Sequence, residues 1–65
     1  MGYRLKAMRV SKGMTQKDLA EKSGVNIRMI QDYEQGNKNI NHAWVDTVIK
    51  LADALECDIR DIIEL

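Results

Sequence analysis

Apolar positions between residues 15 and 35 follow two short helical patterns with one glycine between them. A helix that ends abruptly often needs a residue with positive φ, and Gly24 adopts that conformation without strain. Two helices with so short a connection must cross at a steep angle. The pattern therefore predicts a helix-turn-helix motif over residues 15–35. The positions on its apolar faces are Leu19, Ala20, Met29, Ile30 and Tyr33.

Polar residues stand where each helix of this motif should begin. Thr15 precedes the first helix, and Asp18 follows it by three residues, as in a capping box. Asn26, another favourable N-cap residue, opens the second helix, which we expect over residues 26–35. At about 100° per residue, one face of this second helix lies opposite Ile30 and Tyr33 and is free to contact a partner. It carries Ile27, Arg28, Gln31 and Asp32.

The remaining patterns predict three more helices. The first covers residues 3–12, with Leu5 and Met8 facing inward and a basic exterior formed by Arg4, Lys6, Arg9 and Lys12. A polar loop follows the motif, and we expect its Ile40 to insert into the core. The longest helix should then run from residue 41 or 42 to residue 56. Its apolar stripe is Trp44, Val48, Leu51, Ala52 and Leu55.

The last predicted helix is short and begins behind Asp58, with Ile59, Ile62 and Ile63 on one face. Five helices and no strand pattern make the chain all-α. Trp44 begins the stripe of the longest helix, and a core position is the favoured interpretation, with half exposure as the alternative. The 65 residues form one helix-turn-helix domain over 1–65, because a chain of this length has room for one core.

Composition excludes several classes of protein. Cys57 is the one cysteine and His42 the one histidine, so we expect no disulfide, no metal site and no cofactor. The same shortage argues against an enzyme, because no nucleophile, base and orienting group can be assembled. The first ten residues do not form a signal peptide, and no stretch approaches the roughly 20 apolar residues of a membrane span. These features predict a cytoplasmic protein.

Charge is distributed unevenly although the formal net charge is zero. Residues 1–38 carry eight basic and four acidic side chains, whereas residues 39–65 carry two basic and six acidic ones. A basic half of this kind can face phosphates while the acidic half stays in solvent. Small domains also show such a division by chance.

The segments GMTQKDLAEKSGVN, IQDYEQG and LADALECDIRDII together resemble the phage-repressor and Cro-like (Xre-type) helix-turn-helix family. The resemblance extends over nearly the whole chain. It implies a compact five-helix lambda-repressor-like domain that binds double-stranded DNA, commonly as a homodimer, with residues 26–35 as the recognition helix in the major groove. The positions that carry it are Thr15, Gln16, Ala20, Gly24, Ile30, Tyr33, Glu34, Gln35 and Gly36.

Residue roles follow from that docking. Arg28 is the strongest candidate for reading a base, because its guanidinium fork matches O6 and N7 of guanine. Gln31 can pair with adenine, Ile27 can cover a thymine methyl group, and Asp32 can accept a hydrogen bond from cytosine N4. Asn26 can reach a base edge if its cap leaves a group free, although a role as a cap alone is favoured. The candidates for phosphate contact are Thr15, Gln16, Gln35, Lys38 and Asn39.

Two further expectations concern contacts, one within the chain and one between two copies. Arg9 and Glu34 each follow a core-facing residue and, by resemblance, should form an ion pair. A homodimer should use the acidic C-terminal third, with Trp44, Ile62, Ile63 and Leu65.

The leading hypothesis for the function is a sequence-specific transcriptional regulator that acts as a repressor. The alternative is a protein-interaction module of the same fold with weak or lost DNA binding, which Asp32 and the zero net charge favour.

Overall fold

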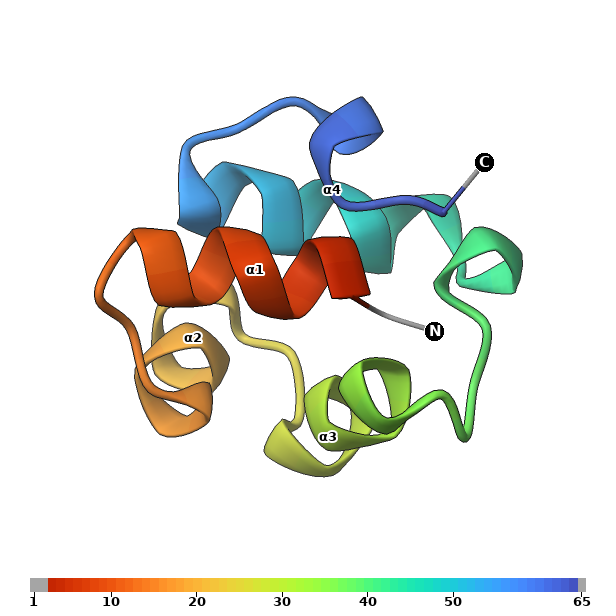
Figure 1. The fold of residues 1–65 in the computed structure, drawn as a ribbon, viewed down its shortest axis with the longest axis horizontal. Helices are drawn as coiled ribbons and strands as arrows, with labels where there is room; N and C mark the ends of the chain where they lie inside the picture. Colours follow the sequence, from red (N-terminus) through yellow and green to blue (C-terminus); the bar gives the residue numbers. More distant parts are fainter. Residues whose placement is uncertain (1–2, 65) are drawn as a thin grey trace.

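Four α-helices and two short 3-10 helices form the structure, a computed structural model that describes residues 3–64 (Figure 1). No strand occurs within that range. The helices are α1 (Tyr3–Ser11), α2 (Gln16–Ser23), α3 (Ile27–Gln35) and α4 (Val45–Leu55). The 3-10 helices are η1 (Ile40–His42), between α3 and α4, and η2 (Ile59–Asp61), after α4.

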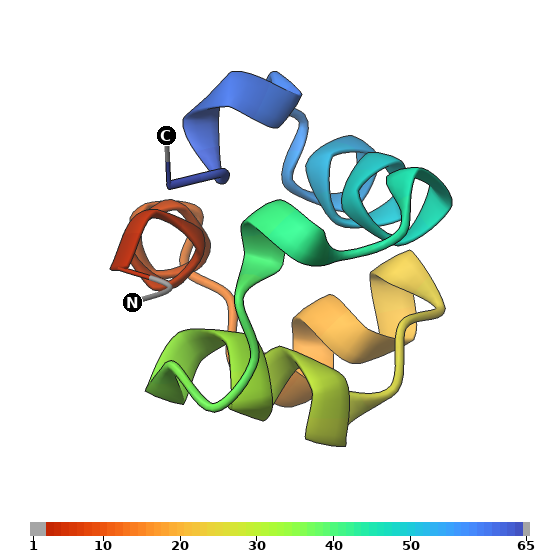
Figure 2. The same cartoon turned by 90° about the vertical axis from the view of Figure 1, so that its right-hand side faces the viewer.

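The helices surround a single core. In Figure 2, α1 and α4 stand on opposite sides, with α2 and α3 below them and η2 above. α2 contacts both α3 and α4, and α1 contacts α3 and η2. The completely buried residues come from all four α-helices, from η1 and from the residue after η2. Those on the α-helices confirm the inward faces predicted from periodicity. The completely buried residues are Leu5, Leu19, Ile30, Ile40, Leu51, Leu55 and Ile62.

The region between α3 and α4 differs from the sequence prediction. The helix expected to begin at residue 41 or 42 begins at Val45, because residues 40–42 form η1 and Ala43 and Trp44 are extended. Trp44 is therefore outside the periodic part of α4, and 79% of it is exposed. The prediction of a core position for Trp44 was wrong, and Val48 is the first buried residue of the stripe.

The chain after α4 also differs from the prediction. The fifth helix is the three-residue η2. Asp58 Oδ1 accepts from the Arg60 N–H, and Asp61 Oδ2 accepts from the Asp58 N–H, both at 3.0 Å. Ile62 is completely buried, so it belongs to the core and not to a dimer surface. Leu65, also expected on that surface, lies outside the described residues. No helix in the described part of the chain is long and apolar enough to cross a membrane.

A candidate nucleic-acid interface

The turn between α2 and α3 is fixed by local hydrogen bonds. Thr15 Oγ1 accepts from the Asp18 backbone N–H at 3.0 Å, and Asp18 Oδ2 accepts from the Thr15 N–H at 3.0 Å. Gly24 ends α2 at φ 76°, where its N–H donates to the Ala20 carbonyl. Asn26 Oδ1 then accepts from the Arg28 N–H at 2.7 Å and starts α3. These caps therefore fix where α2 begins and ends and where α3 begins.

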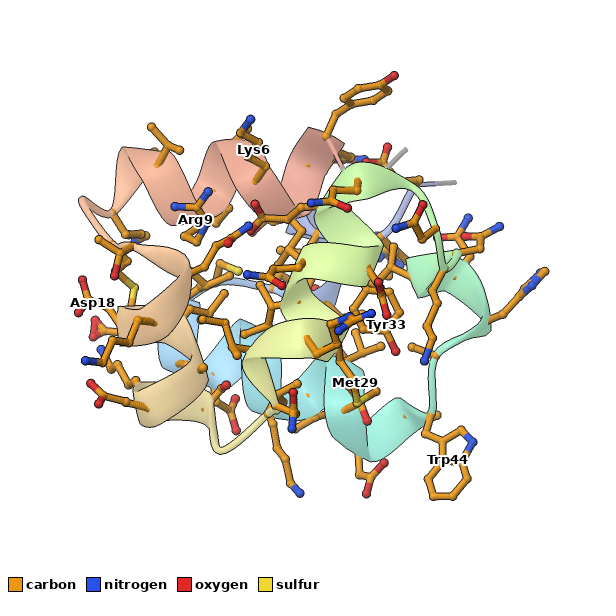
Figure 3. The ribbon with its side chains drawn as sticks, turned by 90° about the horizontal axis from the view of Figure 1, so that it is seen from below. Lys6, Arg9, Asp18, Met29, Tyr33 and Trp44 are labelled. Carbon is orange, nitrogen blue, oxygen red and sulfur yellow. The ribbon has the colours of Figure 1, made fainter. Side chains whose placement is uncertain are left out.

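α3 has one buried side and one accessible side. Ile30 and Tyr33 are buried, and Met29 packs partly against the core. Figure 3 labels Met29 and Tyr33 on this helix. Asn26, Ile27 and Arg28 are exposed, whereas Gln31 and Asp32 are half-buried. The structure therefore brings the five residues predicted to read bases to the accessible side of one helix. Their roles in reading sequence remain predictions.

A buried ion pair joins α3 to α1. Arg9 Nε lies 2.7 Å from Glu34 Oε2, and Arg9 Nη2 donates to Glu34 Oε1 at 3.0 Å, which is a bidentate arrangement. Arg9 Nη1 also donates to the Met14 carbonyl at 2.7 Å. Hydrogen bonding to Glu34 raises the pKa of Arg9 above its usual value, while burial opposes that shift. Arg9 is buried, so it is not part of the basic exterior expected for α1.

Gln16, at the first residue of α2, joins the same network. Its Nε2 donates to Glu34 Oε1 at 3.1 Å. The carboxylate accepts hydrogen bonds only, so the amide nitrogen must face Glu34 and the amide oxygen must face away. Sequence reasoning missed this contact, because it assigned Gln16 only to a phosphate and neither periodicity nor the resemblance paired Gln16 with Glu34.

The loop after α3 is held at several points. Gly36 has φ 82°, and its N–H donates to the carbonyls of Asp32 and Tyr33. The N–H groups of Asn37 and Lys38 also donate to the Asp32 carbonyl, at 2.9 and 3.2 Å. The Lys38 side chain is exposed. These hydrogen bonds hold the backbone of Lys38 just beyond the C-terminal end of α3.

One side chain, that of Asn41, ties the far end of this loop to the C-terminal segment. Asn39 Oδ1 accepts from the Asn41 N–H at 2.9 Å and caps η1. The Asn41 side chain donates to the Glu64 carbonyl at 2.8 Å and accepts from the Glu64 N–H at 2.7 Å. Asn41 was not singled out in the sequence, because no local pattern marks an asparagine that bonds to the backbone 23 residues away.

Burial also affects two titratable groups away from this network, Tyr33 and Cys57. Burial, assisted by the charge of Asp32, raises the pKa of Tyr33, so its hydroxyl stays protonated. Burial, followed by the charge of Asp61, raises the pKa of Cys57 and disfavours a reactive thiolate. Within residues 3–64, no group of three His, Cys, Asp or Glu side chains is placed to hold a metal ion.

Comparisons with known proteins agree with this geometry. The restriction-modification controller protein C.AhdI from Aeromonas hydrophila superimposes with a TM-score of 0.82 and 33% identity, over 92% of this chain and 86% of the controller chain. The clp gene regulator ClgR from C. glutamicum superimposes with a TM-score of 0.77 and 28% identity, over 92% of this chain and 74% of the regulator chain. No curated protein sequence matches the chain. Residues 5–62 match the family HTH_3, described as helix-turn-helix, and the chain belongs to that family.

Proposed function

We propose that this protein is a DNA-binding transcriptional regulator that places α3 in the major groove. The observation that carries the proposal is the accessible side of α3, where residues able to pair with bases stand on a helix fixed at both ends. A helix fits the major groove of B-DNA, and its exposed side chains then meet the base edges. The family and the two regulators of similar structure support the same function.

Phosphate contacts are proposed for the residues on either side of α3. Thr15 Oγ1 uses an acceptor position for its cap and keeps its hydroxyl proton to donate. Gln35 and Asn39 use their side-chain oxygens within the loop, at 3.2 and 2.9 Å, so their amide nitrogens are left to donate. Gln16 uses one N–H of its amide nitrogen for Glu34 and keeps the second. Lys38 adds a positive charge to this set of donors.

We also propose that the protein acts as a repressor and binds DNA as a homodimer. A domain that binds DNA through one short helix contacts few base pairs, and two copies related by a two-fold axis contact two half-sites. Half-sites one helical turn apart require recognition helices about 34 Å apart on one side of the dimer. A regulator bound in this way over a promoter would exclude other proteins from it.

A salt titration tests the DNA-binding proposal. Fluorescein-labelled duplex DNA of random sequence is titrated with the full 65-residue chain, and anisotropy is followed at several salt concentrations. The logarithm of the association constant should fall linearly with the logarithm of salt concentration, by about 0.9 for each phosphate neutralised. A chain that shows no binding at low salt contradicts the proposal. Selection from a random pool then identifies the preferred site.

A further inference from the structure

Asn41 connects the loop after α3 to the C-terminal segment through both ends of its side-chain amide. Its Nδ2 donates to the Glu64 carbonyl at 2.8 Å, and its Oδ1 accepts from the Glu64 N–H at 2.7 Å. Because one end of an amide donates and the other accepts, this pair of bonds admits one orientation of the Asn41 side chain. Glu64 therefore fixes the position and the rotation of Asn41.

Glu64 is itself held by the first turn of α1. Its Oε1 accepts from the Arg4 backbone N–H at 2.8 Å, and Figure 2 shows the C-terminal segment beside α1. The first N–H groups of a helix have no partner within the helix, and α1 has no acidic residue in its first turn. Glu64 supplies an acceptor and a negative charge there. Ile62, two residues earlier, is completely buried and anchors the same segment in the core.

The hydrogen bonds continue from Asn41 to Asn39. The Asn41 backbone N–H donates to Asn39 Oδ1 at 2.9 Å. This bond engages the oxygen of the Asn39 amide, so it also sets the direction of Nδ2 on the same plane. Asn39 is exposed, and its Nδ2 is the donor proposed for a phosphate contact. The direction of that donor therefore depends on where the Asn41 backbone lies.

η1 needs support from outside to hold Asn41 in place. It has three residues, and the hydrogen-bond geometry of a 3-10 helix is poorer than that of an α-helix. Ile40 is 2% exposed and keeps η1 against the core, but an apolar contact has no preferred direction. The two bonds between Asn41 and Glu64 are directional. They fix how η1 is turned about its buried isoleucine.

We propose that Asn41, held by Glu64, is a positioning residue for DNA binding that acts through Asn39. The inference rests on the proposed function, because it requires a phosphate contact from Asn39. A donor that is oriented before DNA arrives loses less conformational entropy on binding. Asn41 is half-buried, and both polar atoms of its side chain are bonded to Glu64, so it acts without touching the duplex.

A double-mutant cycle tests this role. Asn39→Ala and Asn41→Ala are made singly and together in the full chain, and binding to fluorescein-labelled random duplex is measured by anisotropy. Each single variant should weaken binding by about two- to tenfold, the effect of one hydrogen bond. The double variant should bind like Asn39→Ala alone, because Asn41 acts through Asn39. Parental affinity in either single variant, or losses that multiply in the double variant, would overturn the proposal.

Stability is measured on the same proteins by urea denaturation, so that positioning is separated from folding. The bonds between Asn41 and Glu64 do not involve the Asn39 side chain. Asn41→Ala should therefore still lower the free energy of unfolding when Asn39 is already alanine, although its cost in DNA binding should vanish there. Losses of binding that simply follow the losses of stability across the variants would show a purely structural role and overturn the proposal.

The matched control is His42→Ala, because His42 is an exposed residue of the same 3-10 helix. Any loss of binding that this variant causes should multiply with the loss from Asn39→Ala, since His42 does not hold the Asn39 amide. Coupling between His42 and Asn39 as strong as that between Asn41 and Asn39 would overturn the proposal.

Two variants of Glu64 examine the contact with α1. Glu64→Ala removes both the negative charge and the acceptor for the Arg4 N–H, whereas Glu64→Gln removes the charge and keeps an oxygen acceptor. Loss of a negative charge alone favours binding to phosphates. Glu64→Ala should nevertheless bind random duplex more weakly than Glu64→Gln, because its C-terminal segment is held less firmly. Equal affinities of the two variants would overturn the role assigned to Glu64.

The mobility of the Asn39 side chain is read without DNA, by ¹⁵N relaxation of its Nδ2. The amide should be more mobile in Asn41→Ala than in the parent. If it is, but the parent binds no duplex at low salt, Asn41 positions Asn39 and the proposed function fails. If the parent binds duplex with a steep dependence on salt but the Asn39 amide is equally mobile in both proteins, the proposed function stands and the positioning role fails.

Discussion

Gln16 and Glu34 connect the start of α2 to the last turn of α3 through a hydrogen bond of 3.1 Å between Nε2 and Oε1. Glu34 is in turn held by Arg9 from α1. Gln16 therefore stands at a helix N-terminus, where free N–H groups attract anions, with its side chain already oriented. A phosphate contact from a preoriented side chain loses less conformational entropy on binding.

Gln16→Ala should weaken binding to all DNA sequences by the same factor. The proposed contact is to a phosphate, which carries no sequence information. We expect a loss of about 0.5–1.5 kcal/mol in binding free energy, the net contribution of one hydrogen bond. Anisotropy titrations measure the loss in binding free energy for a selected duplex and for a random duplex. A loss confined to the selected duplex would show that Gln16 reads a base.

Arg9→Ala should destabilise the fold strongly. The two side chains of its ion pair are only 11% and 3% exposed, so the substitution leaves the Glu34 carboxylate buried without its charged partner. We expect a cost of about 3 kcal/mol in the free energy of unfolding, measured by urea denaturation. The matched control is Lys22→Ala, which breaks a 3.8 Å pair whose side chains are 51% and 72% exposed. An exposed pair contributes about 0–1 kcal/mol, so equal costs in the two variants would contradict the prediction.

Much of this architecture could be predicted from the sequence because it depends on local chemistry. The capping box of Thr15 and Asp18, the glycines that end α2 and α3, and the apolar spacing of the helices are all set within a few residues. The inward positions of Leu5, Leu19 and Ile30 follow from the same periodicity.

The features that the sequence did not reveal depend on distant contacts. Trp44 satisfies the helical spacing of α4, yet it is exposed because η1 and two extended residues precede the helix. η1 is held in place by Asn41 and Glu64, which are 23 residues apart. The contact between Gln16 and Glu34 spans 18 residues. No local pattern encodes such contacts, whereas the exposure of Ile27 and Arg28 on α3 follows from helical periodicity alone.

Because of Asp18, the free energy of unfolding should depend on pH in the acid range. A hydrogen bond from the Thr15 backbone N–H, followed by the Thr15 side chain, lowers the pKa of Asp18 below its usual 3.8. A carboxyl group with a lowered pKa in the folded state stabilises the fold above its unfolded pKa. That contribution is lost as the pH falls through the folded pKa. Urea denaturation of the parent and of Asp18→Asn should differ at neutral pH and converge in acid, whereas a constant difference would contradict the assignment.

Glu56→Gly should stabilise the protein. Glu56 ends α4 at φ 55°, and it is the one non-glycine residue with positive φ among residues 3–64. Glycine adopts this conformation without the clash of a Cβ atom, and we expect a gain of roughly 0.5–1 kcal/mol in the free energy of unfolding. Glu56→Gln keeps the strained backbone and removes only the charge, so it should gain nothing. Equal stabilities of the glycine and glutamine variants would argue against backbone strain as the cause.

Arg28 and Lys38 should differ in what their removal does to DNA recognition. Arg28 is exposed in the first turn of α3 and combines a positive charge with a bidentate fork, so Arg28→Ala should lose about 1–3 kcal/mol of preference at one base pair. Lys38 is exposed in the loop beyond α3, so Lys38→Ala should weaken binding to all sequences and reduce the salt slope by about one.

Binding-site selection with each variant separates these two effects. The Lys38→Ala protein should select the same site as the parent, because the base contacts from α3 are intact. The Arg28→Ala protein should select sites in which one position has become degenerate. Since both variants lose a single positive charge, a change in selectivity unique to Arg28→Ala must come from contact with a base and not from net charge. An Arg28→Ala protein that selects the parental site with the same stringency would show that another side of the protein faces the bases.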